Sequence, residues 1–205
     1  MQPFIHPMMG RRQKVRLIAG SAGNVTSSGS TTTFTPTGTA AGDLLILICG
    51  GTTPTISGGA GSGWSYSNQV GGGTNIQTCY KILAAGDVGA TFTISATANT
   101  APFLWVTYRG PVAMTLKESV AQPSGAALTF TGFTPGSTNV AALVVGFSHG
   151  GGSAVGATFP AGWTTDASLN AFDIKSVTTS PEYASGSISI TGISGAICAT
   201  LWELI

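Results

Sequence analysis

Residues 41–51, AGDLLILICGG, decide the fold. An uninterrupted apolar run of strand length, bounded by glycines and an aspartate, is typical of a central β-strand that is covered on both faces. A second run of this kind occurs at residues 137–151, STNVAALVVGFSHGG. After each run come a glycine-rich gap, a Gly-Trp pair, two alternating strands and an apolar closing strand. The sequence therefore predicts an internal pseudo-repeat, with halves of about 17–111 and 112–205.

The remaining pattern consists of short strands and turns, and no segment has a helical period over twelve or more residues. A hairpin is expected around Gly71–Gly73, and residues 50–63 are expected to form a glycine-rich loop. Roughly a dozen strands at spacings of about 8–15 residues favour an all-β, antiparallel two-sheet β-sandwich of jelly-roll-like type. Because no charged or proline-rich linker separates the halves, we expect a single domain over residues 17–205, with the halves intertwined. The expected strands are 14–19, 31–37, 43–49, 64–66, 77–83, 90–96, 103–108, 127–133, 139–148, 159–165, 172–177, 187–191 and 197–204.

The composition predicts a subunit of a larger assembly. Charged residues are only 7% of the chain, against roughly 25% in an average soluble domain, while 42% of residues are hydrophobic. The solvent-facing side chains would be mostly Thr, Ser, Gly and Asn, which do little to oppose self-association. We therefore expect a homo-oligomer or a multi-copy component. No apolar run approaches the ~18 residues of a membrane span, so no membrane partner is expected.

Basic charge is concentrated in an N-terminal arm, residues 1–16. Residues 1–42 carry four basic and no acidic side chains, whereas residues 43–205 carry four basic and seven acidic ones. The arm also contains apolar side chains and two prolines, which suit an extended anchor on an acidic partner surface. A disordered leader is the alternative reading. The anchoring residues would be Phe4, Ile5, Met8, Met9, Arg11, Arg12, Lys14 and Arg16.

The order of features in the arm is not that of a secretion signal, because the basic cluster follows Pro3, His6 and Pro7 and no apolar core separates it from them. We therefore expect folding in a cytoplasm. Nucleic acid is an unlikely partner, since four basic residues are few and the body adds no basic face.

The motifs GDLL, SGW, YKILAAGD, TFTIS and YRG resemble those of a family of roughly 200-residue all-β domains found in tailed-phage virion proteins and bacterial surface proteins. Members of that family share the pattern "PAGVxAGDLLL…PSGWT…YYKIATAGD…YTFT…AYRG", and the resemblance covers residues 17–205. It implies a virion component, with structural rather than catalytic motifs. The chain departs from the pattern at Ser65, where the family has Thr, and in its unusually glycine-rich first half.

No catalytic signature is present, so we expect no enzyme. His149 lies beside Ser148 where a strand opens into a glycine loop, but no G-x-S-x-G elbow surrounds it, and a contact-forming histidine is the simpler reading. The carboxylates are scattered singly; Asp43 and Asp87 are expected to accept hydrogen bonds from turn amides. Asp166 and Asp173 flank one hairpin and could share a site or merely solvate it.

Neither a cofactor nor a metal is expected. Three cysteines, Cys49, Cys79 and Cys198, form no C-x-x-C pair, so buried free thiols are expected, although a single bridge stays open as an alternative. Trp64 and Trp163 occupy matching positions in the halves and are expected to fill the core. Tyr66 is expected to be an exposed aromatic residue of the glycine-rich region.

Two functions therefore compete. The first is a structural protein of a bacteriophage virion, a capsid decoration or tail-associated subunit held to capsid or tail proteins by its arm. The second is a carbohydrate- or receptor-binding module that uses loop aromatics such as Tyr66, with His149 as a further contact residue.

Overall fold

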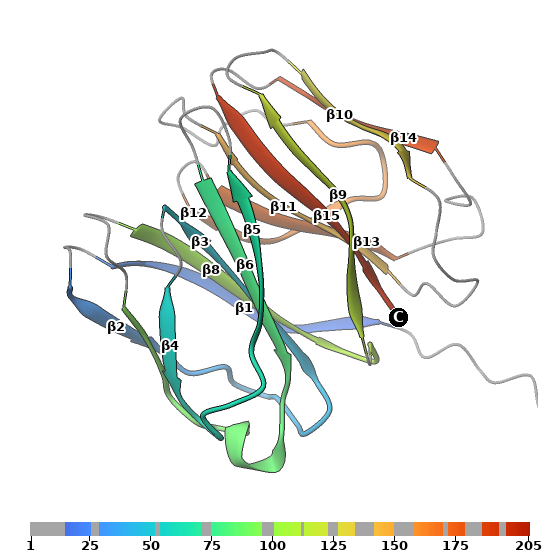
Figure 1. Cartoon of the computed structure of the whole chain (residues 1–205). Coiled ribbons are helices and arrows are strands. Elements are labelled where there is room, and N and C mark those ends of the chain that lie inside the picture. The colour runs from blue at the N-terminus through green and yellow to red at the C-terminus, as the bar shows by residue number, and fades with distance from the viewer. Residues whose placement is uncertain are drawn as a thin grey trace, which may run out of the picture.

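The chain folds into β-strands and their connections. The computed structural model (Figure 1) describes residues 15–25, 29–51, 54–70, 75–95, 101–111, 113–122, 127–133, 142–149, 158–169, 172–178, 186–192 and 196–205. Within these ranges the only helical segment is one 3-10 turn, η1 (Ala85–Asp87). The prediction of an all-β fold is confirmed.

Two five-stranded antiparallel sheets form the middle of the molecule. Inner sheet 1 has the strand order β1 (Arg16–Val25), β8 (Ala101–Arg109), β3 (Leu44–Gly50), β6 (Asn75–Ile82) and β5 (Ser65–Val70). Inner sheet 2 has the order β12 (Thr164–Leu169), β13 (Phe172–Thr178), β11 (Ala142–His149), β15 (Ile197–Leu204) and β9 (Met114–Gln122).

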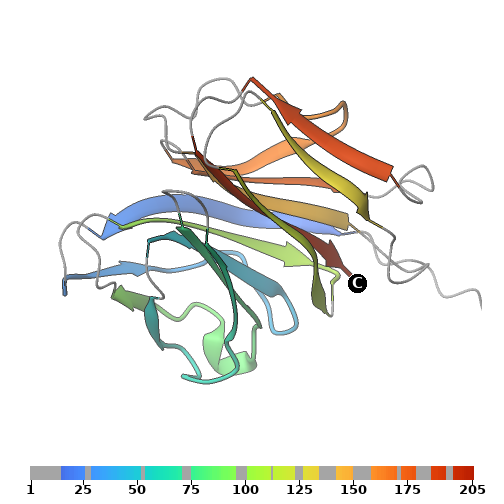
Figure 2. The same ribbon diagram turned by 45° about the horizontal axis from the view of Figure 1, so that its top comes forward.

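A smaller sheet covers the outside of each inner sheet. Outer sheet 1 consists of β2 (Thr31–Phe34), β7 (Phe92–Ser95) and β4 (Thr55–Gly58). Outer sheet 2 consists of β10 (Ala127–Phe133) and β14 (Gly186–Thr191). Figure 2 shows the resulting stack, with the first half of the chain below and the second half above.

Three apolar layers separate these four sheets. Successive side chains of β3 point to opposite faces of inner sheet 1, and both faces are covered, so its whole apolar run is buried. The side chains that face the layer between the inner sheets are Leu44, Ile46 and Ile48, and those that face outer sheet 1 are Leu45, Leu47 and Cys49. The prediction that this run is a central strand is confirmed. The middle layer is completed from the second half by Met114, Ala167, Ile174, Cys198, Trp202 and Leu204.

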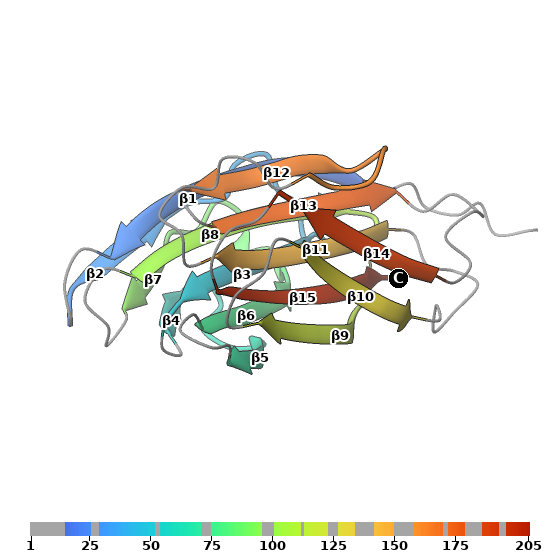
Figure 3. The ribbon, with the colours of Figure 1, turned by 90° about the horizontal axis from the view of Figure 1, so that it is seen from above.

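The two inner sheets overlap so that their edges coincide. Figure 3 shows β1 and β12 along one side of the stack and β5 and β9 along the other, and both pairs of strands are in contact. We call these sides the β1/β12 flank and the β5/β9 flank. Every described strand pairing stays within one half of the chain, so the expected intertwining is not found among the described strands. A connection of four residues, 110–113, suffices to pass from β8 to β9 because the sheets that contain them are stacked.

Several strand bounds differ from the predictions. β4 lies inside the expected loop 50–63, β9 had not been delimited, and β12 begins at Thr164 rather than at Phe159. β1 continues to Val25, beyond the predicted strand 14–19, through several Gly and Ser residues. The physical reason is close packing, because a Cβ added at Gly20 would lie 2.5 Å from the backbone oxygen of Asp166. Small residues therefore serve here to bring β1 against β12.

Candidate functional site

Of the predicted anchoring residues, the structure describes Arg16 alone. Arg16 is exposed and is the first residue of β1, where it stands opposite Arg109 of β8. The other arm residues lie outside the described residues: Phe4, Ile5, Met8, Met9, Arg11, Arg12 and Lys14. The arm therefore joins the body at the exposed end of an edge strand.

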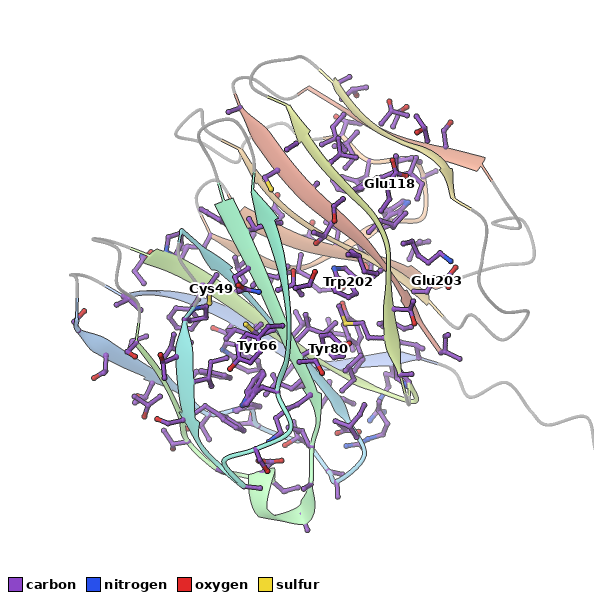
Figure 4. All side chains as sticks on the ribbon, in the orientation of Figure 1. Cys49, Tyr66, Tyr80, Glu118, Trp202 and Glu203 are labelled. Carbon is purple, nitrogen blue, oxygen red and sulfur yellow. The ribbon has the colours of Figure 1, made fainter. Side chains whose placement is uncertain are left out.

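The two predicted loop-contact residues are on strands. Tyr66 lies on β5 opposite Cys79 and is 47% exposed, as predicted, and the part of it that is buried raises its pKa. Figure 4 shows it on the first half of the molecule, near Cys49. His149 is the last residue of β11 and pairs with Ile197 of β15, but its side chain lies outside the described residues. The structure does not bring Tyr66 and His149 together in any described contact.

A cleft of about 340 Å³ opens on the β1/β12 flank, between the two halves. One wall comes from the first half and combines Val15, just before β1, and Leu17 of β1 with Tyr108. The opposite wall comes from β12, β13 and the turn before them, and it carries a carboxylate and several hydroxyl groups. The lining residues are Val15, Leu17, Tyr108, Gly162, Thr164, Thr165, Asp166, Ser176 and Val177.

Tyr108 and Asp166 join the two walls of this cleft. The Tyr108 hydroxyl donates a hydrogen bond to Oδ2 of Asp166, and Ser176 is a further hydrogen-bond partner of Tyr108. Tyr108 is fully buried in the middle layer, and this burial, together with the nearby Asp166 charge, raises its pKa well above the ordinary value. The neutral phenol is therefore a fixed donor to Asp166, which holds the cleft carboxylate in place.

Asp43 and Asp87 are in ion pairs, whereas Asp166 has no described ion-pair partner. Its contacts are hydroxyl groups, from Tyr108 and, at 3.3 Å, from Thr164. Of the described cationic side chains, none has a nitrogen within 4.0 Å of an Asp166 oxygen. Lys175, the cation on the neighbouring strand, instead donates to Thr165 Oγ1 at 2.6 Å and lies 5.0 Å from the ring centre of Phe159. The cleft therefore presents an anion that no described cation neutralises.

Asp87 forms the most deeply buried ion pair among the described residues. Its Oδ1 lies 3.0 Å from Lys81 Nζ, and both side chains are almost completely buried. Asp87 also accepts hydrogen bonds from the backbone amides of Ala60 and Ala84, while Lys81 donates to the carbonyl of Ser62. Burial by itself would raise the pKa of Asp87, but the hydrogen bonds from Ala60, Ala84 and Lys81, with the Lys81 charge, lower it below the ordinary value. The expected turn-capping role of Asp87 is confirmed, and the ion pair was not foreseen.

The other ion pairs also tie strands and loops together. Asp43 accepts two hydrogen bonds of 2.8 Å from Arg109 and one from the amide of Ala40. Its pKa is lowered chiefly by the hydrogen bonds from Arg109. Lys117 lies 3.6 Å from the fully buried Glu203, and the neighbouring Glu118 accepts a hydrogen bond from the amide of Thr131. These carboxylates hold the fold together.

The cysteines and tryptophans belong to the core. Cys49, Cys79 and Cys198 are buried free thiols, as predicted, and burial raises the pKa of each; that of Cys198 rises to about 11. Trp64 packs against the apolar layer of outer sheet 1 and Trp163 against that of outer sheet 2, as predicted. Raised thiol pKa values are the opposite of what a nucleophilic cysteine needs.

The Tyr108–Asp166 cleft was not predicted from the sequence. Asp166 had been considered together with Asp173, and Tyr108 only as the end of an apolar strand. The two residues are 58 positions apart and lie in different halves, so no local pattern could associate them. The one available signal was that Tyr108 ends an otherwise apolar strand with a polar group that needs a partner when it is buried.

Comparisons of the chain with protein-family models, with curated proteins and with solved structures found no match. Among the described residues, no helix is long and apolar enough to cross a lipid bilayer. Within the same residues, no three His, Cys, Asp or Glu side chains gather into a group that could hold a metal ion.

Proposed function

We propose that this chain is a non-enzymatic structural protein of a bacteriophage virion, a capsid decoration or tail-associated subunit that its N-terminal arm anchors to a capsid or tail protein. The proposal starts from the family resemblance of residues 17–205. The observation that carries it is how the charges of the body are used. Three of the four cations after residue 16, Lys81, Arg109 and Lys117, are in ion pairs inside the fold.

The carboxylates are used in the same way. Asp43, Asp87, Asp166, Glu118 and Glu203 each contact a neighbouring strand, turn or side chain of the fold. Side chains occupied in this way favour a scaffold over a reaction centre. The lysine and arginine residues that lie outside these contacts are then concentrated in the arm, beside its apolar residues.

We also propose that each half is a jelly-roll sandwich and that the two halves are copies of one unit. In the first half, successive strands alternate between the inner and outer sheets in the manner of a jelly roll, except for β5 and β6, which both lie in the inner sheet. The inner sheets of the two halves have the same strand order. In each, the first strand of the half lies beside the last, and the third strand and a hairpin follow, as β1-β8-β3-β6-β5 and β9-β15-β11-β13-β12. The pairing of Thr158 with Thr191 stands where β4 pairs with β7.

The registers of the edge strands support the same proposal. β1 has one irregularity, directly after Leu17, which lies opposite Tyr108. β9 has one at the corresponding place, directly after Leu116, which lies opposite Trp202. One extra residue at corresponding places in two strands is what two copies of one unit would have.

The test of the proposed function is removal of residues 2–14, which leaves β1 complete from Arg16. Particles assembled with the full chain or with the truncated chain are purified, and the copy number of the protein is measured by quantitative mass spectrometry. We expect the truncated chain to be lost from particles while it still folds and unfolds in one cooperative transition. Incorporation of the folded truncated chain at full copy number would reject the proposal.

Carbohydrate or receptor binding is the second candidate, and the exposure of Tyr66 on the edge strand β5 favours it. An exposed aromatic ring can stack on the apolar face of a sugar. Glycan-array binding that is lost in Tyr66→Ala and kept in Tyr80→Phe would support this function, whereas binding by neither the native chain nor the variants would remove it.

A further inference from the structure

The inference starts from the unneutralised carboxylate in the cleft on the β1/β12 flank. Asp166 is partly buried, its orientation is fixed by Tyr108, and Thr164 provides a second hydroxyl contact. A carboxylate oxygen can accept two hydrogen bonds, so Asp166 retains acceptor capacity toward the cleft. The apolar side chains of Val15 and Leu17 lie across from it. An aliphatic stem that carries a cationic head matches this combination of surfaces.

The rest of the body has no free cation to supply. Lys81, Arg109 and Lys117 are paired with Asp87, Asp43 and Glu203, respectively. Lys175 is held by Thr165 and by the ring of Phe159. The remaining basic residues of the whole sequence are Arg11, Arg12, Lys14 and Arg16. The sequence thus concentrates its other lysine and arginine residues in one segment. The structure places a carboxylate that has no described cationic partner in one cleft.

The position of the arm satisfies the reach that such a contact needs. Val15, the first described residue, is itself part of the cleft wall. Consecutive Cα atoms are 3.8 Å apart, so the Cα of Arg12 lies at most about 11 Å from that of Val15. An arginine side chain extends about 6 Å farther and can bind a carboxylate through two parallel hydrogen bonds. Because the arm is part of the same chain, its effective concentration at the cleft is high.

We propose that the basic part of the arm, Arg11 and Arg12, docks into the cleft of its own body and pairs with Asp166. This inference rests on the proposed function and divides the arm into two parts. The basic root is held by the body, and the apolar tip, with Phe4, Ile5, Met8 and Met9, is the part that reaches the capsid or tail partner. The charges then orient the arm, and the apolar residues provide the contact area with the partner.

Limited trypsin digestion of the full chain tests this docking, because trypsin cleaves after Arg11 and Arg12. The variant is Asp166→Asn, which removes the negative charge and keeps an oxygen that can accept the Tyr108 hydrogen bond. We expect cleavage at these two sites to be about fivefold faster in the variant, which corresponds to loss of a pair of about 1 kcal/mol. Salt screens a pair of this kind. Raising its concentration from about 0.05 to about 0.5 M should therefore accelerate cleavage of the native chain and not of the variant.

The matched control is Glu118→Gln, which removes one negative charge from β9 on the opposite flank. It should leave the cleavage rates at Arg11 and Arg12 unchanged. Equal rates in the native chain and Asp166→Asn at low salt would overturn the inference, and so would the same acceleration in Glu118→Gln.

A second measurement covers the case in which Asp166→Asn fails to fold. Arg12→Lys keeps the charge and adds an amine that a carbodiimide can couple to a carboxylate without a spacer. We expect a cross-linked peptide that joins position 12 to Asp166 within one chain; a mixture of ¹⁵N-labelled and unlabelled protein separates coupling within a chain from coupling between copies. Cross-links only to other carboxylates, or only between copies, would refute docking on the same body. If docking fails but removal of residues 2–14 still abolishes incorporation into particles, the proposed function survives without this inference.

Discussion

Each half has a lysine on the strand that pairs with its central strand, and the two lysines have different partners. Lys81 and Lys175 each lie on the strand next to the central strand, opposite Leu45 and Val145. Lys81 is 3% exposed, bonded to Asp87, and 5.7 Å from the ring centre of Trp64. Lys175 is partly exposed and uses a threonine hydroxyl and the ring of Phe159. The packing of an inner sheet against its outer sheet therefore does not by itself require an ion pair at this position.

The difference indicates what the ion pair of the first half is for. Asp87 binds the amide of Ala60, and Lys81 binds the carbonyl of Ser62, so the pair fixes the loop between β4 and β5. That loop leads to Trp64, which closes the edge of the apolar layer under outer sheet 1. The Lys81–Asp87 pair thus binds the backbone of a glycine-rich loop that has few side chains of its own to pack against the sheet.

The flanks of the middle layer show a second contrast. On the β1/β12 flank the buried aromatic residue is Tyr108, and its hydroxyl donates to Asp166 of the other half. On the β5/β9 flank Trp202 meets Tyr80 edge to face, with ring centres 5.7 Å apart. Both residues are labelled in Figure 4. The Trp202 indole nitrogen is buried without a hydrogen-bond partner among the described atoms. The first flank is thus joined by a hydrogen bond to a carboxylate. On the second, the Thr78 and Thr200 hydroxyls, 3.5 Å apart, and a hydrogen bond between Cys198 and the backbone of Ile76 accompany the aromatic packing.

Removing the carboxylate in the first half should have the largest effect. In Asp87→Ala, Lys81 would be a buried charge without a partner, and the free energy of unfolding should fall by about 3–5 kcal/mol. Thr165→Ala removes the corresponding hydroxyl of the second half and should cost about 1 kcal/mol or less, because Lys175 can reach water. Urea denaturation of both variants measures the difference.

The control for this prediction is the double variant Lys81→Met with Asp87→Ala. Replacing both members of a buried pair by apolar groups commonly restores stability, so we expect it to recover part of the loss. The recovery should be incomplete, because the amides of Ala60 and Ala84 also lose their acceptor. Similar losses in Asp87→Ala and Thr165→Ala would show that the two lysines are held alike.

The next effect concerns the backbone contact on the β1/β12 flank. Gly20→Ala would force β1 away from the carbonyl of Asp166 and should lower the free energy of unfolding by about 1–3 kcal/mol. Gly86→Ala is the matched control, because its added Cβ would come no closer than 3.8 Å to Ala60, and it should change stability by about 0.5 kcal/mol or less. A thermal melt of each variant suffices; equal melting temperatures would contradict the close packing of this flank.

These contacts also mark the limit of what the sequence could predict. The run from Leu44 to Cys49, the hairpin of β5 and β6, and the bounds of β10 and β15 follow from local periodicity and turn residues, and all are found. The prediction for β1 ends too early because two of its glycines serve contacts with distant strands. Gly20 allows the approach of Asp166 of β12, and Gly23 leaves room for the Phe103 ring of β8. The Tyr108–Asp166 contact has the same origin. Residues selected by distant packing leave no local signature.

The hydroxyl of Tyr108 should have a smaller effect than the glycine contact. Tyr108→Phe removes the donor to Asp166 and should cost about 1–2 kcal/mol, within the range for a hydrogen bond to a charged group. On the other flank, Tyr80→Phe keeps the ring contact with Trp202 and should cost about 0.5 kcal/mol or less. Urea denaturation at pH 7 measures both; a larger loss in Tyr80→Phe would reverse the assignment of the polar contact to the β1/β12 flank.

The smallest effect is the acid dependence of the Asp43–Arg109 pair, which joins β8 to the turn before β3. Arg109 holds the pKa of Asp43 below its ordinary value, so the pair contributes stability above about pH 4, the ordinary aspartate pKa. That contribution is lost as the pH falls through the lower pKa of the folded state. In Arg109→Gln the pKa of Asp43 should rise toward the ordinary value, and less stability should be lost between about pH 4 and pH 2. Carboxylate ¹³C chemical shifts follow the titration directly, and Lys117→Gln, which breaks the pair on the second half, should leave the Asp43 midpoint where it is. A midpoint that does not move in Arg109→Gln would mean that the amide of Ala40, rather than the ion pair, keeps Asp43 ionised.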